Sequence, residues 1–83
     1  MKSNCFPLAL APAYSNLEIV EVVAGHGLKT RLGDMGIIPG AEIKLVSPAT
    51  TGPVIIEVKS CRLALGRGVA QRIMVIEKPK LEG

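Results

Sequence analysis

Aromatic side chains are nearly absent from this sequence. Its 83 residues include no tryptophan, one phenylalanine (Phe6) and one tyrosine (Tyr14). Domains that bind proline-rich peptides need an aromatic-lined groove, and proteins that bind single-stranded nucleic acid usually stack bases on aromatic rings. Neither function is therefore expected. The core must be built from the aliphatic side chains that supply most of the 48% hydrophobic content.

The residue patterns of common enzymes and metal sites are also missing. His26 is the one histidine, no phosphate-binding GxxxxGK motif occurs, and Cys5 and Cys61 lie too far apart for a CxxC pair. We therefore predict no catalytic residue, no required cofactor and no dedicated metal site. His26 and Cys61 are the candidates for binding a transition metal such as Fe²⁺ or Zn²⁺, if folding brought them together. The simpler interpretation places His26 in a solvated loop and Cys61 in the core.

Strong charge and long apolar runs are absent as well. Six lysines and four arginines against six glutamates and one aspartate give a net charge of +3, which is mildly basic. A nucleic-acid-associated barrel would need a stronger basic patch together with aromatic residues, so that alternative is disfavoured. No uncharged apolar stretch approaches the roughly 18 residues that a membrane-spanning helix needs.

The most informative segment lies between residues 28 and 40. Leu28, Leu32 and Met35 follow the i, i+4, i+7 spacing of one helical face, which predicts a helix of about two turns. Gly36 can adopt the left-handed conformation that ends a helix. Pro39-Gly40 then has the chemistry of a type II turn. The segment therefore predicts a short helix, its end, and a turn into a strand.

Short runs rich in β-branched residues predict an all-β fold. In the first run, Val20 and Val22 are expected to share one face, with Ile19 on the other. A single helical turn is expected over 69–73, a loop over 47–53 and a frayed tail over 77–83. These features predict one domain over residues 1–83, with its core over about 8–76: a small β-barrel of about five strands with one short α-helix between the first two long strands. The expected strands are 17–24, 41–46, 54–58, 62–65 and 74–76.

An ordered set of short motifs resembles the FeoA family, over about residues 8–76. Two positions depart from the family pattern: Ala13 stands where glycine is usual, and Val69 stands where an acidic residue often precedes the late alanine. The matching motifs are Leu10-Ala11-Pro12, Arg31-Leu32, Asp34-Met35-Gly36-Ile37, Pro39-Gly40, Gly52-Pro53, Ala70 and Arg72-Ile73.

The resemblance implies an SH3-like barrel and a non-enzymatic accessory protein of ferrous iron uptake. It implies a cytoplasmic protein that works with FeoB, a membrane permease with a cytosolic GTPase domain, and that reaches the inner face of the membrane through this transporter. A related barrel forms the C-terminal domain of metal-dependent repressors of the DtxR type. The stand-alone transport protein is expected here. The alternative that remains open is a metal-responsive module that binds Fe²⁺ or Zn²⁺.

Protein contact is the simplest function for a barrel without catalytic groups. We expect the helix to provide the contact surface through Lys29, Arg31 and Asp34, with Met35 able to contribute at its rim because a thioether adapts to irregular surfaces. Gly36, Pro39 and Gly40 are expected to have structural roles. Unpaired strand edges could also allow pairing between copies of the chain, so a homo-oligomer remains open.

Overall fold

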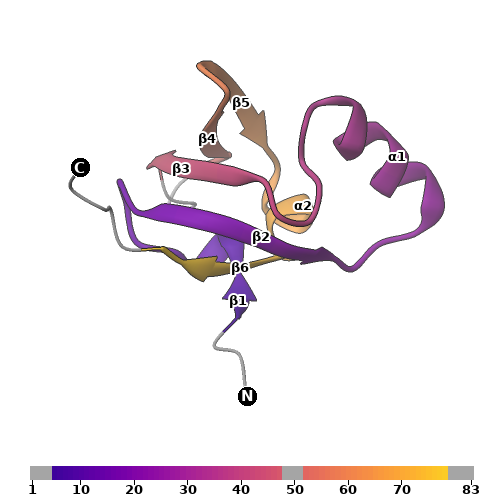
Figure 1. Ribbon diagram of the computed structural model, residues 1–83, viewed down its shortest axis with the longest axis horizontal. Helices are drawn as coiled ribbons and strands as arrows, with labels where there is room; N and C mark the ends of the chain where they lie inside the picture. The colour runs from indigo at the N-terminus through magenta and orange to yellow at the C-terminus, as the bar shows by residue number, and fades with distance from the viewer. Residues whose placement is uncertain (1–4, 48–51, 79–83) are drawn as a thin grey trace.

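The computed structural model describes residues 5–47 and 52–78 (Figure 1). The N-terminal part contains β1 (Phe6–Pro7), the 3₁₀ helix η1 (Leu8–Leu10), β2 (Asn16–Val22) and α1 (His26–Asp34). The remainder contains β3 (Glu42–Ser47), β4 (Val54–Val58), β5 (Cys61–Leu65), α2 (Arg67–Ala70) and β6 (Ile73–Glu77).

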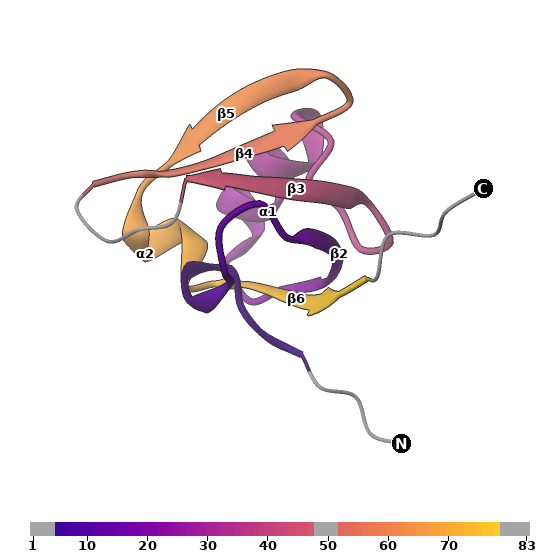
Figure 2. The same ribbon diagram turned by 90° about the vertical axis from the view of Figure 1, so that its left-hand side faces the viewer.

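The strands form one antiparallel sheet in the order β1-β6-β2-β3-β4-β5. Figure 2 shows that the sheet is strongly curved, and that α2 and η1 lie toward one end of it. The all-β, SH3-like barrel with one short helix between its first two long strands is thus confirmed. Aliphatic side chains fill the core, as the composition required; the largest fully buried ones are Leu8, Leu17, Ile19, Leu32, Ile37, Leu45, Ile56, Ile73, Val54 and Val75.

The first strand departs from the predicted alternation. Ile19 pairs with Val75 and Glu21 pairs with Met74, so Val20 is an extra residue in a β-bulge. Because the bulge shifts the pattern by one residue, Ile19 and Val22 both point into the core while Val20 is exposed. The prediction that Val20 and Val22 share a face was therefore wrong.

The opening turn forms although Ala13 replaces the usual glycine. Tyr14 takes the left-handed conformation with φ 63°, and its N–H donates to the carbonyl oxygen of Leu45 at 2.6 Å. The hydroxyl of Ser15 donates to the carbonyl oxygen of Pro12 at 2.6 Å. These bonds hold the turn against β3, with the positive φ at Tyr14 rather than at Ala13.

The elements around the C-terminus differ slightly from expectation. The predicted helical turn begins earlier, at Arg67, because Ile73 already belongs to β6. The sequence did not predict the short elements β1 and η1. Residues 48–51 of the expected loop and 79–83 of the expected tail lie outside the described residues.

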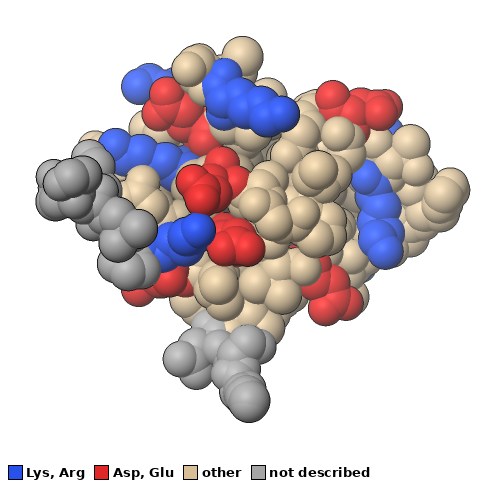
Figure 3. Space-filling model, viewed as in Figure 1, with Lys and Arg blue, Asp and Glu red and all other residues tan. Residues whose placement is uncertain are grey.

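Lys78 ties the end of β6 to the outer face of the sheet. Glu18 and Glu42 lie directly opposite each other on β2 and β3, an unfavourable pair of like charges. The Nζ of Lys78 lies 3.0 Å from the Oε2 of Glu42 and 3.6 Å from the Oε1 of Glu18. The hydrogen bond from Lys78 to Glu42, with the charges of Glu42 and Glu18, raises the pKa of the ammonium group above 10.5. Figure 3 shows acidic and basic side chains interspersed on this face.

The variant Lys78→Met is expected to unfold at a slightly lower temperature, because Glu18 and Glu42 then repel without a bridging cation. The folded-state pKa of Lys78 lies above that of the unfolded chain, so its contribution is complete below pH 10.5 and is lost as pH rises through the folded-state pKa. Thermal unfolding would be measured at pH 7 and above pH 11. The difference in unfolding temperature between Lys78→Met and the wild type should be smaller at the higher pH. Lys29→Met is the control; a constant difference at both pH values would contradict the bridging role.

Candidate protein interaction site on helix α1

Helix α1 is anchored to the barrel by a small apolar stripe. Leu32 is buried and Leu28 is partly buried, as their spacing predicted. Met35, the third residue of that predicted stripe, instead caps the helix and is 42% exposed. The helix therefore presents most of its circumference to solvent, as its position beside the barrel in Figure 1 indicates.

The helix ends in a Schellman motif. The N–H of Gly36 donates to the carbonyl oxygen of Gly33 at 3.0 Å, and the N–H of Ile37 donates to that of Leu32 at 2.9 Å. Gly36 has φ +90°, a conformation that side chains disfavour. Leu32 and Ile37 are both buried, which supplies the apolar contact typical of this motif. Gly36 therefore occupies the left-handed position at the end of the helix.

A type II turn then leads into β3. The N–H of Ala41 donates to the carbonyl oxygen of Ile38 at 3.0 Å, and Gly40 has φ +91°, which leaves Pro39 at the second turn position. The N–H of Gly40 also donates to the carbonyl oxygen of Ile19 at 2.7 Å. The turn is thus fixed to β2, and it holds the C-terminal end of α1 in place.

The four predicted contact residues are all exposed, but they do not share one face. Successive residues of an α-helix turn by about 100°, so Asp34, Arg31 and Met35 fall within an arc of about 100°. Lys29 lies at least about 120° outside that arc. We call the surface of Arg31, Asp34 and Met35 the α1 flank. The structure brings these three together and leaves Lys29 on the other side of the helix.

The charges of this surface are available for a partner. Within residues 5–47 and 52–78, the side chains of Lys29, Arg31 and Asp34 take part in no ion pair. Arg31 lies in the last turn of α1, where a cation interacts favourably with the helix dipole. A partner could therefore bind both charges of the α1 flank without breaking an existing ion pair.

Apolar side chains near α1 were not predicted as part of the site. Val23, which follows β2, and Ile38, in the turn after α1, are each 51% exposed. Ile38 lies near the helix at Gly33, since a Cβ added to that glycine would lie 3.6 Å from the Cγ2 of Ile38. The sequence offered little indication that Ile38 is exposed, because the residue preceding a Pro-Gly turn can face either the core or solvent. Figure 3 shows an uncharged surface between the charges of the sheet and those near α1.

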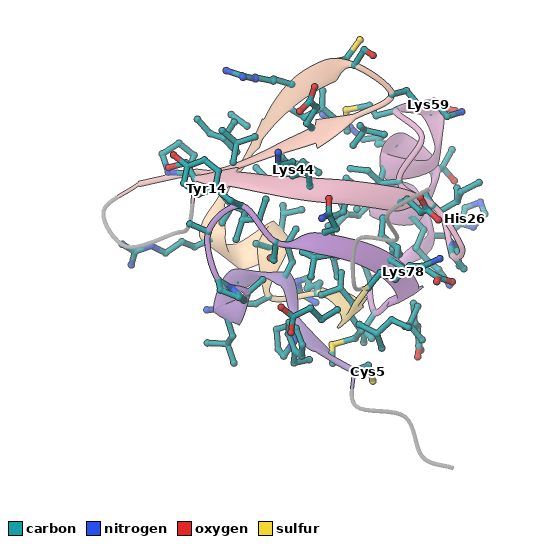
Figure 4. The ribbon with its side chains drawn as sticks, turned by 60° about the vertical axis from the view of Figure 1, so that its left-hand side comes forward. Cys5, Tyr14, His26, Lys44, Lys59 and Lys78 are labelled. Carbon is teal, nitrogen blue, oxygen red and sulfur yellow. The ribbon has the colours of Figure 1, made fainter. Side chains whose placement is uncertain are left out.

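The candidate metal ligands lie on separate elements. His26 begins α1 and Cys61 begins β5, and both are exposed. The expectation that Cys61 is a core residue was wrong, because it lies directly after the turn of the β4–β5 hairpin, at the start of the edge strand β5, where its side chain is exposed. Cys5 and Cys61 are free thiols, and Figure 4 shows Cys5 and His26 on different parts of the molecule. The described residues contain no group of three or more histidine, cysteine or acidic side chains that could bind a metal ion together.

The helices in the described ranges are all too short or too polar to cross a membrane.

Comparison with known proteins identifies a family for most of the chain. Residues 6–77 match the FeoA domain. The chain is 40% identical over 70 residues to the "Putative Fe(2+) transport protein A" of Methanocaldococcus jannaschii, covering 84% of each chain.

Solved structures share the same architecture. A crystal structure titled iron uptake regulatory protein (FeoA) superposes with a TM-score of 0.82 at 34% identity, covering 89% of this chain and 99% of that one. T. acidophilum IdeR has a TM-score of 0.82 at 22% identity, covering 94% of this chain and 36% of that one. The second likeness is one of fold alone, and it involves only part of the larger protein.

Proposed function

The chain belongs to the FeoA family, and from this premise we propose that it serves ferrous iron uptake by binding the cytosolic part of a FeoB-type GTPase permease. The family supports a role in Fe²⁺ uptake. The proposed mode of action is contact between proteins, with any hydrolysis of GTP carried out by the permease. On this proposal the chain is a cytoplasmic, non-enzymatic accessory protein without a resident cofactor, and it reaches the membrane through its partner.

The α1 flank is the proposed contact surface. The observation that carries this proposal is the combination of an anchored helix with exposed groups of three kinds: the cation of Arg31, the carboxylate of Asp34 and the thioether of Met35. Arginine and methionine are enriched in protein interfaces relative to the rest of the protein surface. The Schellman motif and the following turn hold this helix end in a fixed geometry, which lowers the entropic cost of binding.

Charge reversal on the two sides of α1 tests the proposal. Arg31→Glu is expected to weaken binding to the isolated cytosolic domain of the cognate permease by about tenfold, since it removes a cation and adds a repelling carboxylate at the contact. The matched control Lys29→Glu makes the same change in net charge on the other side of the helix, and a change of less than about twofold is expected there. Isothermal titration calorimetry would measure both affinities.

Two results would contradict the proposed surface. Unchanged affinity in a folded Arg31→Glu protein would remove the α1 flank from the contact. Equal losses for both variants, abolished by salt, would indicate long-range attraction by net charge instead of a contact on one side of the helix.

A further inference from the structure

Strand β5 is an unprotected edge of the sheet. The sheet ends at β1 on one side and at β5 on the other. β1 has two residues, and one of them is Pro7, which has no N–H to donate. β5 has five residues without a proline. In Figures 1 and 2, β5 lies at the periphery, and no other helix or strand of the described residues runs along its outer side.

The register of the β4–β5 hairpin shows which backbone groups face outward. Lys59 and Ser60 have φ of 50° and 70°, the conformation of a two-residue type I′ turn, so Val58 and Cys61 form the hydrogen-bonded pair that closes the hairpin. Hydrogen-bonded and non-hydrogen-bonded pairs alternate from there. The N–H and C=O groups of Arg62 and Ala64 therefore point away from β4. In the described part of the chain, these four groups accept or donate no backbone hydrogen bond.

This edge is complementary to itself, and we propose that it pairs with β5 of a second copy of the chain. In an antiparallel pairing with its twofold axis at Leu63, Arg62 of each copy faces Ala64 of the other. All four outward groups of each strand are then used, giving four intermolecular hydrogen bonds. The two Leu63 residues face each other as a non-hydrogen-bonded pair.

Other symmetric registers are less favourable. An axis at Arg62 places two arginines directly opposite each other, and like charges in that position are destabilising. An axis at Ala64 places Arg62 opposite Gly66, beyond the end of the strand. With the axis at Leu63, Arg62 lies between Glu57 of its own β4 and Ala64 of the second copy. The partner of β5 is therefore a second copy in one register, and the small contact makes the dimer weak and dependent on concentration.

Opposite charges at position 64 test this dimer. Ala64→Glu places a carboxylate opposite Arg62 of the second copy, twice per dimer, and is expected to lower the dimer dissociation constant about fivefold. Ala64→Lys is expected to raise it by a similar factor. Ala64 is exposed and faces Ile55 on β4, so both variants should fold. Thr30→Glu, on the exposed side of α1, controls for net charge.

Analytical ultracentrifugation of the full chain, up to about 1 mM, would measure these constants. A monomer throughout that range, or a dimer that responds equally to Ala64→Glu and Ala64→Lys, would overturn the proposal.

Cysteine pairing tests the register separately. In a background with Cys5→Ser and Cys61→Ser, Leu63→Cys should form an intermolecular disulfide, because the Cα atoms of a non-hydrogen-bonded pair lie about 4.5 Å apart. Oxidised glutathione would accept the two electrons and two protons from the thiols and leave as two reduced glutathione molecules. Ala64→Cys in the same background should cross-link more slowly, since residue 64 faces residue 62. Equal rates at the two positions would overturn the register.

Discussion

The variant Leu32→Ala is expected to lose about 2–5 kcal/mol of unfolding free energy. Leu32 is 2% exposed and is the one fully buried side chain of α1 in the described chain. Its removal leaves a cavity between the helix and the barrel, and it also removes the apolar contact of the Schellman motif with Ile37. A helix of nine residues is marginal without tertiary packing, so α1 should open more often than the strands do.

Chemical denaturation would measure the global loss for Leu32→Ala, and amide hydrogen exchange would locate it. Met35→Ala is the matched control on the same helix: Met35 is 42% exposed, so a loss below about 1 kcal/mol is expected. Similar losses for both variants would show that Leu32 does not anchor the helix. Leu32→Ala should also weaken binding to the permease, because it disorders the α1 flank.

The variant Gly36→Ala is expected to destabilise the fold by about 1–2 kcal/mol through the backbone alone. Gly36 has φ +90°, which an L-residue adopts only with strain. A Cβ at this position would lie 3.5 Å from the Cγ1 of Val58, an ordinary contact, so steric overlap is not the cause. Thermal and chemical unfolding would measure the loss.

A second glycine of the same segment provides the control for Gly36→Ala. Gly33 lies inside α1 with ordinary helical φ, and a Cβ there would lie 3.6 Å from the Cγ2 of Ile38. Alanine fits this space and favours the helix, so Gly33→Ala is expected to stabilise by about 0.5–1 kcal/mol. Destabilisation at both positions would point to packing and would contradict the role of positive φ at Gly36.

The segment around α1 could be predicted from the sequence because its signals are local. The spacing of Leu28 and Leu32, the glycine that ends the helix and the Pro-Gly turn each follow from the conformations that those residues permit. The expected strand over 41–46 has a local signal of the same kind, since β3 alternates the buried Ile43 and Leu45 with the exposed Glu42 and Lys44. These elements needed no knowledge of distant partners.

Other features depend on partners far away in sequence, and the sequence did not reveal them. The bulge at Val20 arises from pairing with β6, more than 50 residues later, and it reverses the face of the following residues. β1 is too short for a periodic pattern and exists through its pairing with Val75 and Met74. The position of Cys61 likewise depends on β5 being an edge strand.

The candidate site was only partly predictable for the same reason. The helical pattern showed that Arg31 and Asp34 point away from the core, and the structure places both in solvent. The prediction from the helical pattern did not distinguish Arg31 and Asp34 from Lys29, because it assigned all polar positions of the helix to one surface. The exposure of Ile38 follows from the way the turn attaches to β2, which is a tertiary contact.

The central claim is that the α1 flank contacts the cytosolic domain of the FeoB-type permease. The most direct test is to add that unlabelled domain to the ¹⁵N-labelled chain and to follow the amide resonances of every residue. The expected result is a set of shifted or broadened signals concentrated over residues 28–38 and strongest around Arg31, Asp34 and Met35. Changes confined to other faces of the barrel, or no change at a saturating concentration of the domain, would contradict the claim.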